Sequence, residues 1–585
     1  MKGGLFMAVP VKFDLLKNQY GRRGSFWFVC DREKEEGRTT FLCGLLNGLN
    51  SPCPRDGNIF SIALRQDGAE IPYTSVGTPQ YVEMTWKGGS ARILIQNAEI
   101  MRLEAKGNIQ IVLKPLLQPH EIAKSRNDGS WEVCFAPAPK VLVYPVRGTM
   151  EVVTGFDVIN SVPGETSFTF VPNADGIIDI ALHMYKVNSF RLSSYPSFEE
   201  CLNEIGKEFD AFLDTAPLLP EAYKALRAYA AYMVWSHIMC VDGCEIIYMN
   251  KGIHKVASTW QQSHQAIGQY RNPELAWALM ESVFHFQDES GMVPDGIHDM
   301  FSVFSGTKPP FVGVAWQFLR EYTDFSMIPE KRWHKLYQGL RELVYWWLSF
   351  RDTDHDMLLQ YDAADESGWD DSSMFAGGVP LSTPDLSTYM ILAMEALSQM
   401  AGHMGRTFEE RDWKQKSEEI LQKMLDSLWD GRQFVTRLTD TGEVLRCESI
   451  MRFLPLLLGQ RLPKAVIDAM VSELKQEGGW LTPYGLAGER LSSPRCNESG
   501  WSSGPVLAPT QLLICLGLRA CGEDGLAAEI THRYINALIN SNFAMVMSPT
   551  SGKDVSEGRW SNRYPNRMSW TCLIFLVLGS LYLVS

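Results

Sequence analysis

Residues 351–385 read RDTDHDMLLQYDAADESGWDDSSMFAGGVPLSTPD and connect two stretches, 330–350 and 385–404, whose apolar residues recur at helical spacing. This connector combines Trp369 and several glycines with a group of carboxylates. The carboxylates are Asp362, Asp365, Glu366, Asp370, Asp371 and Asp385. An indole face can pack on the apolar face of a pyranose ring while a nearby carboxylate acts on the glycosidic oxygen. The connector therefore predicts either a carbohydrate site on a helical scaffold or a structural acidic turn.

Helical spacing continues on both sides of this connector, from about Ser197 to the end of the sequence. The further stretches are 198–214, 220–240, 273–287, 310–323, 408–428, 447–459, 464–475, 509–521, 525–541 and 569–583. Helices joined by alternately short and long polar segments predict a toroid in which inner and outer helices alternate. The long connectors should gather at one end of this toroid, where loops on a rigid scaffold commonly carry chemistry.

Residues 1 to about 210 have a different texture. Short segments rich in β-branched and aromatic residues, such as NIFSIALR (58–65) and ARILIQNAEI (91–100), alternate with Gly, Asn, Asp and Pro. Their spacing of roughly ten to fifteen residues predicts a large two-sheet antiparallel sandwich. We therefore expect a multidomain β + α protein, with a β-sandwich domain and linker helix over 1–210 and a helical domain over 211–585.

Composition excludes several functional classes. The 585 residues include 54 Lys and Arg against 68 Asp and Glu, a net charge of −14 that disfavours nucleic acid and anionic membranes as partners. The 12 cysteines form no CxxC pair of metal spacing and predict reduced thiols. The N-terminus carries no signal-peptide pattern, and the apolar run 570–585 is shorter than the ~20 residues of a bilayer span. We expect a cytoplasmic protein, with its oligomeric state left open.

The segment ESGWDDS (366–372), followed by GGVP and PDL, resembles the acid-bearing loop of glycoside hydrolase family 63. That family includes processing α-glucosidases and mannosylglycerate hydrolases and is related to trehalases. Further similar segments follow in the same order: STWQQSHQAIG (258–268), KPPFVGVAWQF (308–318), WLTPYGL (480–486), SGWSSGPVLAPTQLL (499–513) and SWTCLIFL (569–576). The resemblance covers most of residues 250–585. It implies a β-sandwich joined to an (α/α)6 toroid and an inverting glycosidase.

By the family's pattern, Asp370 is the general acid that protonates the leaving oxygen. Burial against Trp369 and like-charge repulsion from Glu366 and Asp371 should raise its pKa, as a general acid requires. Asp371 stands where the family is usually not acidic and could share the proton. Because consecutive side chains diverge, however, only one of the two should face the sugar.

An inverting enzyme needs a second carboxylate across the sugar to activate water. The aligned stretch 542–553 places Met545 where the family has this glutamate, and a thioether cannot accept a proton from water. Other polar family positions are also replaced, by Gln261, by Met374, and by Ser502 or Ser503. Either the bound sugar or the reaction therefore differs from the family's usual one.

Three carboxylates are alternatives for the missing base: Glu498, Glu557 and Asp554. Glu557 lies in an insertion near the usual base loop, among arginines that would keep a carboxylate ionised or bind an anionic group such as a uronate. A solvated charged loop is the alternative there. Glu498 precedes Trp501 on a loop that lines the site in the family.

Other residues are predicted to contact the sugar, from their family positions or from helical spacing. They are Trp260, Gln261, His264, Glu366, Trp369, Asp371, Tyr484 and Trp501. A core role is the alternative for Trp260 and Trp501. His264 lies one helical turn after Trp260 and should project on the same face, although a lone histidine is more often a satisfied core group.

Asp352, Asp354 and Asp356 form a D-x-D-x-D run similar to a calcium loop, but the expected glycine is missing and Ala363 stands where a glutamate should close the loop. We expect an acidic turn and no metal or cofactor, with calcium as the alternative. The sequence as a whole predicts an inverting, exo-acting, α-glucosidase-like hydrolase of an α-linked small saccharide or glycoside. A lyase- or epimerase-like enzyme and a non-catalytic carbohydrate-binding relative are the alternatives.

Overall fold

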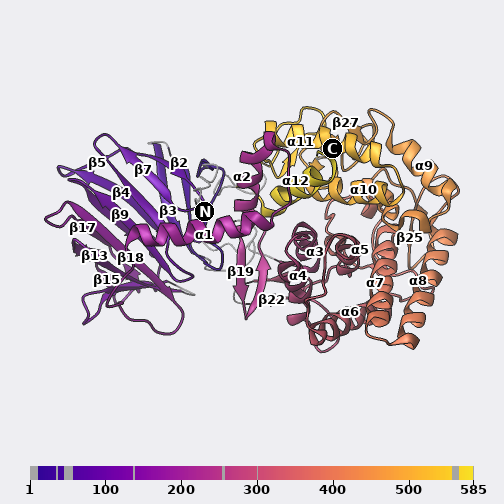
Figure 1. Cartoon of the computed structure of the whole chain (residues 1–585), viewed down its shortest axis with the longest axis horizontal. Helices are drawn as coiled ribbons and strands as arrows, with labels where there is room; N and C mark the ends of the chain where they lie inside the picture. The colour runs from indigo at the N-terminus through magenta and orange to yellow at the C-terminus, as the bar shows by residue number, and fades with distance from the viewer. Residues whose placement is uncertain are drawn as a thin grey trace, which may run out of the picture.

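The chain folds into two lobes joined by the long helix α1 (Phe198–Thr215), as Figure 1 shows. The computed structural model describes residues 11–34, 37–44, 57–135, 139–252, 257–298, 301–556 and 566–583. The lobe on the left of Figure 1 carries the strands that precede α1, and the lobe on the right carries the helices that follow it. The predicted order of a β-sandwich followed by a helical unit is confirmed.

The sandwich consists of two antiparallel sheets. One sheet has the order β1 (Tyr20–Gly21), β2 (Phe28–Lys34), β3 (Gly37–Cys43), β4 (Asn58–Gln66), β10 (Gln110–Pro115), β17 (Ser167–Val171) and β14 (Thr149–Val153), with β5 (Ala69–Ile71) paired to β4. The other has the order β11 (Ile122–Ser125), β12 (Trp131–Cys134), β13 (Lys140–Arg147), β18 (Ile177–Tyr185), β9 (Ile100–Lys106), β8 (Gly89–Ile95), β7 (Val82–Trp86) and β6 (Thr74–Gly77).

Alternation along the strands builds the core of the sandwich. Leu103 of β9 lies opposite Ile180 of β18, and both are fully buried between the sheets. Their neighbours Arg102 and Asp179 point to the other face, where Arg102 Nε donates to Asp179 Oδ1 at 2.9 Å. Successive side chains of a strand face opposite sides of its sheet, so this period of two separates the apolar core from the polar face.

The helical lobe is a closed ring of inner segments surrounded by outer helices. The inner segments are α3 (Thr259–Gly268), α5 (Val312–Tyr322), α7 (Pro384–His403), η4 (Ile450–Arg461), α10 (Ala508–Ala520) and α12 (Ser569–Tyr582). The outer helices are α2 (Lys224–Trp235), α4 (Pro273–His285), α6 (Glu330–Phe350), α8 (Thr407–Leu428), α9 (Lys464–Leu474) and α11 (Asp524–Asn540). Each inner segment contacts the next, and α12 closes the ring on α3. The predicted (α/α)6 toroid is confirmed.

Burial distinguishes inner from outer helices. Sixteen of the 20 residues of α7 are buried, whereas only five of the 22 residues of α8 are. A helix that is apolar on most sides must be covered on most sides, and an amphipathic one needs cover on one face only. Gly313 lets α5 approach α7 closely, because a Cβ at this position would lie 2.4 Å from the Ala393 nitrogen.

The segment η4 is a 3₁₀ helix rather than the α-helix that the apolar spacing over 447–459 predicts. Pro455 lies inside it and removes a backbone donor, and Gly459 has a non-helical φ of 57°. The apolar run near the end of the sequence forms α12, the last inner helix, as expected.

All long connectors of the toroid lead from an outer helix to the next inner one, so they lie at the same end. They contain β19 (Ile238–Val241), β20 (Cys244–Ile247), β21 (Gly296–Ile297), β22 (Ser302–Val303), β23 (Gln360–Tyr361), η2 (Ala364–Ser367), η3 (Ser373–Phe375), β24 (Leu381–Ser382), β25 (Thr436–Leu438), β26 (Val444–Leu445), β27 (Leu481–Thr482), β28 (Gly485–Leu486), β29 (Val506–Leu507) and β30 (Val546–Met547). Three short elements precede the toroid: β15 (Phe156–Asp157), β16 (Val162–Pro163) and η1 (Glu221–Tyr223).

Candidate active site

The acid loop, residues 364–375, lies in the connector between α6 and α7. Gly368 follows η2 with a φ of +80°, in the left-handed region that favours glycine. A Cβ at this position would also lie 3.0 Å from the Trp260 ring. Glycine is therefore required at 368, and it sets the direction in which Trp369 and Asp370 leave the turn.

Asp370 is exposed to solvent, although protein atoms crowd it on most sides. The resulting desolvation raises its pKa to about 6. The ammonium of Lys308 opposes this shift, and like-charge repulsion from Asp365, Asp371 and Asp295 reinforces it. Solvent thus reaches the Asp370 carboxyl although the protein atoms around it desolvate it. Its raised pKa lets it hold a proton in mildly acidic solution.

Asp371 points away from this position and is held by the connector between α9 and α10. Its carboxylate accepts the backbone N–H groups of Trp501 and Ser502 at 2.7 and 2.6 Å, and the hydroxyls of Ser502 and Ser503 at 2.7 and 2.9 Å. Burial alone would raise the pKa of Asp371, but these four donors lower it below its usual range. Asp371 is thus an ionised anchor of the acid loop, although the sequence predicts a sugar contact at this position.

The next two residues of the acid loop are fastened to two other segments. The Ser372 hydroxyl donates to Ser449 Oγ at 2.7 Å, just before η4. The Ser373 hydroxyl donates to Glu489 Oε2 at 2.7 Å, and the other oxygen of Glu489 accepts the Ser493 hydroxyl at 2.7 Å. Burial raises the pKa of Glu489. Three consecutive residues after Asp370 therefore hold the acid loop in place, which preorganises the acid.

Lys308 and Asp295 also lie beside Asp370, and sequence reasoning missed both. Lys308 Nζ contacts Asp295 Oδ1 at 2.7 Å and donates to the backbone carbonyl of Asp365 in a short hydrogen bond. The Lys308 side chain is 9% exposed. The sequence signal that could have identified Lys308 is its position as the first residue of the KPPFVGVAWQF segment, which resembles a family motif.

The predicted sugar-binding tryptophans form one buried cluster. Trp260 contacts Trp369 edge to face with ring centroids 5.8 Å apart, and it contacts Trp570 in the same way at 5.2 Å. Trp501 stacks on Trp570 with an interplanar angle of 9° and retains 8% exposure. Trp260 and Trp369 are 2% and 1% exposed, which fits the core role left open for Trp260 and gives Trp369 the same one. Because the Trp260 ring also packs against Gly368, this buried cluster supports the acid loop from inside the protein.

His264 and Gln261 belong to the same inner helix, α3. His264 is fully buried, its Nδ1 donates to the Trp260 carbonyl at 2.7 Å, and its ring stacks on Phe311 at 4.8 Å. Burial lowers the pKa of His264 to about 4, so the imidazole is neutral at ordinary pH. Gln261 is 8% exposed and accepts a short hydrogen bond from the Ser258 hydroxyl at the start of the helix. Both side chains thus have partners inside the fold.

Glu366 is a buried structural carboxylate. Its Oε1 pairs with Arg351 Nη2 at 2.8 Å, and its Oε2 accepts the Asp362 N–H at 2.9 Å. The side chain is 3% exposed. The sequence predicts a sugar contact at Glu366, whereas these bonds fasten η2 to the end of α6.

The segment that follows α11 contains the position at which the sequence resemblance places the family's base. Met545 is buried there, at 1% exposure. The exposed Glu498 reaches the same segment and accepts the hydroxyls of Ser548 and Thr550 at 2.7 and 2.8 Å. These hydroxyls lower the pKa of Glu498, so it is ionised. Tyr484 is half-buried and also borders this segment, packing against Gly552.

Of the two remaining base candidates, Asp554 and Glu557, only Asp554 lies within the described residues. Asp554 pairs with Arg567 Nη1 at 2.8 Å and accepts the backbone N–H of Ser556 at 2.9 Å. Arg567 is buried. This ion pair gives Asp554 a structural role. Glu557 lies outside the described residues.

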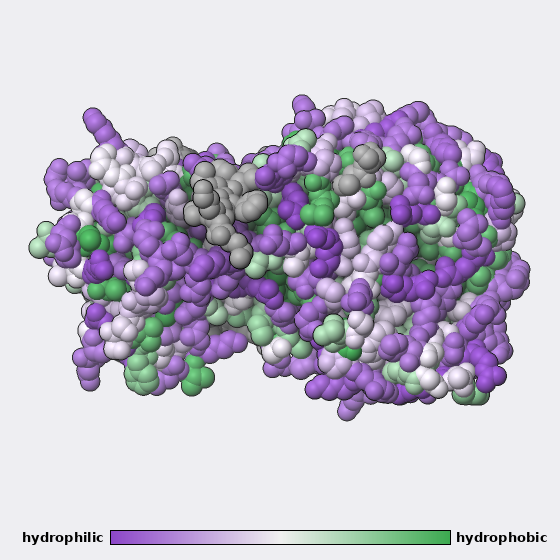
Figure 2. Space-filling view, in the orientation of Figure 1, coloured by the Kyte–Doolittle hydropathy of each residue, from purple (hydrophilic) through white to green (hydrophobic). Residues whose placement is uncertain are grey.

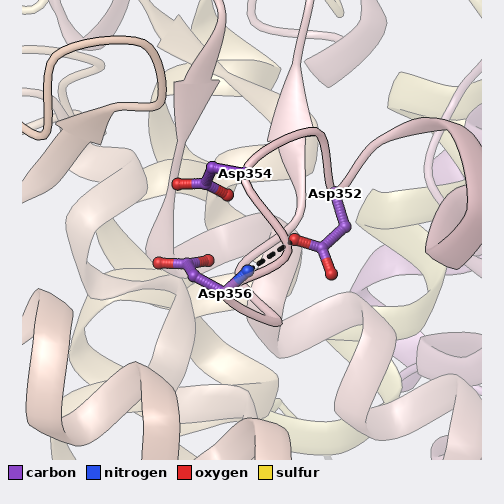
Figure 3. Close-up of side chains that lie close together, drawn as sticks. All are labelled: Asp352, Asp354 and Asp356. Atoms are coloured by element: carbon purple, nitrogen blue, oxygen red, sulfur yellow. Dashed lines mark hydrogen bonds between the residues drawn. The ribbon is translucent and has the colours of Figure 1, made fainter.

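Asp352, Asp354 and Asp356 bring three carboxylates together at the end of α6, as Figure 3 shows. Asp352 Oδ1 accepts the Asp356 N–H at 3.0 Å. Arg437 Nη2 contacts Asp354 at 2.9 Å and makes a shorter contact with Asp356. The guanidinium thus supplies positive charge to two of the carboxylates that a cation would need.

We therefore expect calcium to leave the thermal stability unchanged. A metal that binds only the folded state raises Tm with concentration. Melting curves recorded with EDTA and with millimolar calcium should differ by less than about 1 °C. A Tm that climbs steadily with calcium would establish the alternative, a metal site at these three aspartates.

A sandwich joined to an (α/α)6 toroid, with a fastened acid loop among the long connectors, is the architecture of a glycosidase of the helical-toroid class. The family model of the mannosylglycerate hydrolase MGH1-like glycoside hydrolase domain matches residues 255–570, more than half of the chain. The chain belongs to this family and is a glycoside hydrolase. The predicted relationship to glycoside hydrolase family 63 is confirmed.

Solved structures share the fold. The mannosylglycerate hydrolase of glycoside hydrolase family 63 from Thermus thermophilus, in complex with Tris and D-glycerate, has a TM-score of 0.51 and 17% identity. Its complex with glucose has a TM-score of 0.50 and 18% identity, and each match covers 60% of this chain and 99% of the other. No curated protein matches the sequence. Within the described ranges, every helix is too short or too polar to traverse a bilayer.

Proposed function

We propose that this glycosidase is an inverting, exo-acting enzyme on α-linked small saccharides or glycosides, with Asp370 as its general acid. The observation that carries the proposal is the state of Asp370: open to solvent, desolvated, with a pKa of about 6, on a loop fastened by three consecutive residues. A carboxyl in this state can give its proton to the glycosidic oxygen as the bond to the anomeric carbon breaks. The leaving group then departs as a neutral alcohol.

Water must attack the anomeric carbon from the opposite face, with its proton taken by a second carboxylate. We assign this role to Glu498, with Glu557 as the alternative. Glu498 is ionised and hydrogen-bonded to Ser548 and Thr550, in the segment where the family carries its base at the position of Met545. This contact is what favours Glu498.

The charged groups around Asp370 restrict the charge that a leaving group can carry. Asp295 and Asp365 lie close enough to Asp370 to act on it, and Lys308 is the cation among them. A negatively charged leaving group such as glycerate, which the Thermus enzyme was crystallised with, would meet net repulsion here. We therefore propose a neutral glycoside, with α-glucosides as the first choice because glucose binds the related fold.

The test uses α-D-glucosyl and α-D-mannosyl fluoride, followed by NMR from the first turnover. We expect the β-anomer of the free sugar as the first product, because attack from the opposite face inverts the anomeric carbon. Asp370 must be protonated to act on a leaving group that needs a proton, so kcat/KM for the methyl α-glycoside of the same sugar should fall as pH rises through about 6. Glu498→Ala should be slow, and azide should restore turnover while forming the β-glycosyl azide.

Each other outcome of this test indicates a different function for the protein. An α-anomer as first product would exclude inversion, and an unsaturated or epimerised sugar would establish the lyase- or epimerase-like alternative. Binding without turnover on either fluoride and on the matching disaccharides would leave a carbohydrate-binding relative. Azide rescue of Glu557→Ala but not of Glu498→Ala would move the base to Glu557.

A further inference from the structure

A cavity with a volume of about 360 Å³ lies on the sandwich lobe. Its floor is the outer face of the sheet that contains β9, β13 and β18, and its wall is the strap, residues 191–199, which leads into α1. Every residue that lines the cavity belongs to the sandwich, the strap or the first turn of α1, and none belongs to the toroid. Sites for small organic molecules have volumes of roughly 300–1,000 Å³, so this cavity can hold a ligand about the size of a monosaccharide.

Side chains fix the strap against the sheet. Arg102 is 1% exposed, its Nη1 donates to the Pro196 carbonyl at 3.3 Å, and its guanidinium lies over the Tyr195 ring, 4.9 Å from the centroid. Arg191 Nη2 donates to the Pro145 carbonyl of β13 at 2.9 Å. The floor and the wall are therefore held together without a ligand, which reduces the entropic cost of binding one.

The three carboxylates that line the cavity already have arginine partners. Asp179 Oδ1 accepts a hydrogen bond from Arg102 Nε at 2.9 Å. Arg92 Nη2 contacts Glu104 at 2.9 Å and Glu199 at 2.7 Å. The negative charge of the floor is thus compensated within the protein, and it offers little attraction to a cation.

Two other arginines that line the cavity lack such a partner. No carboxylate oxygen of a described residue lies within 4 Å of Arg147 or Arg191. Arg147 lies opposite Asp179 in the register of β13 and β18, but Asp179 is bound to Arg102. The hydroxyls of Ser193 and Ser194, on the strap, make no hydrogen bond with the described part of the chain. Guanidinium and hydroxyl donors therefore remain available on the walls of one cavity.

Charge determines which ligands this cavity can accept. The chain as a whole has a net charge of −14, yet four cationic side chains line the cavity against three carboxylates. Guanidinium groups bind the oxygens of phosphates and carboxylates with paired N–H donors. A cation would be repelled, and an apolar molecule would desolvate the two arginines without replacing their hydrogen bonds to water. A small organic anion is the class of ligand that satisfies these donors.

We propose that the cavity under the strap is a second binding site, separate from the active site, for a small organic anion that carries a phosphate or carboxylate group. Arg147 and Arg191 bind the anionic group. The hydroxyls of Ser193 and Ser194 bind polar atoms of the rest of the molecule, which is about the size of a monosaccharide. The site goes beyond the proposed hydrolysis and does not depend on it.

The test is isothermal titration calorimetry of the full chain at low ionic strength with glucose 6-phosphate, glucuronate and glucose. We expect one-to-one binding of at least one of the two anions, and the tighter one identifies the preferred anionic group. Glucose, which has no charge, should bind at least about tenfold more weakly, and added salt should weaken the binding of the anion. Failure of both anions to bind at millimolar concentration would overturn the site, as would equal affinities for glucose and for the tighter anion.

Substitutions locate the bound anion. Arg147→Gln should weaken binding of the tighter anion about tenfold, because it removes a charge-assisted hydrogen bond, and Arg147→Gln/Arg191→Gln should abolish it. Arg432→Gln is the matched control, since this arginine is exposed in a turn of the toroid and its loss changes the net charge equally. Binding that survives the double variant, or that falls equally in Arg432→Gln, would refute the assignment. Melting curves check that the variants fold, and Arg147→Gln, which breaks no bond of the described structure, decides alone if the double variant does not.

Discussion

Asp370→Asn should lower kcat on unactivated glycosides by about 10²–10⁴-fold, the usual contribution of a general acid. The amide keeps the size of the side chain but cannot donate a proton as an acid does. Since Asp370 is exposed and makes none of the bonds that fasten the acid loop, Tm should stay unchanged. The measurement is kcat with methyl α-glycosides, combined with a melting curve.

The leaving group provides the internal control for this substitution. Fluoride departs with little need of a proton, so Asp370→Asn should impair hydrolysis of the glycosyl fluoride far less than hydrolysis of the methyl glycoside. Asp440→Asn, an exposed aspartate in the turn between β25 and β26, should change neither rate. Equal losses on fluoride and methyl glycoside would show that Asp370 does not act as the acid.

Asp371→Ala should reduce both stability and activity. It removes an acceptor of four hydrogen bonds and leaves the N–H groups of Trp501 and Ser502 without that partner, at a cost of roughly 3 kcal/mol in free energy of unfolding. The acid loop also loses an anchor next to Asp370, and a displacement of about 1 Å at a catalytic group can cost roughly 100-fold in rate. Denaturant unfolding and kcat measure the two effects.

The pH dependence of the free energy of unfolding distinguishes Asp371 from a side chain that stabilises the fold by packing alone. Its pKa is lowered in the folded state, so its stabilising effect is present above the ordinary aspartate pKa and is lost as pH falls through the lowered value. Asp371→Ala should remove this part of the acid sensitivity. Ser373→Ala, which takes away one hydrogen bond of the same loop, should cost only about 1 kcal/mol. Equal effects of the two substitutions would refute the anchoring role.

Periodicity predicted the fold well because burial itself imposes it. Alternation along β9 and β18 and the contrast between α7 and α8 can be seen directly in the sequence, since each position records whether one face or all faces are covered. The 3₁₀ geometry of η4 escaped this reasoning. Its apolar spacing resembles that of an α-helix, and only Pro455 and Gly459 distinguish the two.

The sequence predicts Asp370 as the acid, but it does not predict how the residues around Asp370 are arranged. A pair of adjacent carboxylates does not reveal which one faces solvent, because that depends on the turn at Gly368 and on donors 130 residues away at Trp501. The ion pair of Asp295 with Lys308 joins two residues that lie far apart in the connector between α4 and α5. No periodic pattern in the sequence predicts it. Trp260 and Trp369 are predicted from the sequence to contact the sugar, and only packing shows how little of each ring is accessible.

The ring of inner helices closes between α3 and α12, which are the first and the last of the six in chain order. The sandwich in Figure 1 lies apart from that ring, and Figure 2 shows a waist between the two bodies. During synthesis the two sheets can therefore pair while the ribosome is still adding the second half, whereas the edge of the sandwich that bonds to α2 and the toroid itself are completed later. A nascent chain that stalls before α12 emerges would expose the inner faces of five unclosed segments, and chaperone demand should peak in that interval.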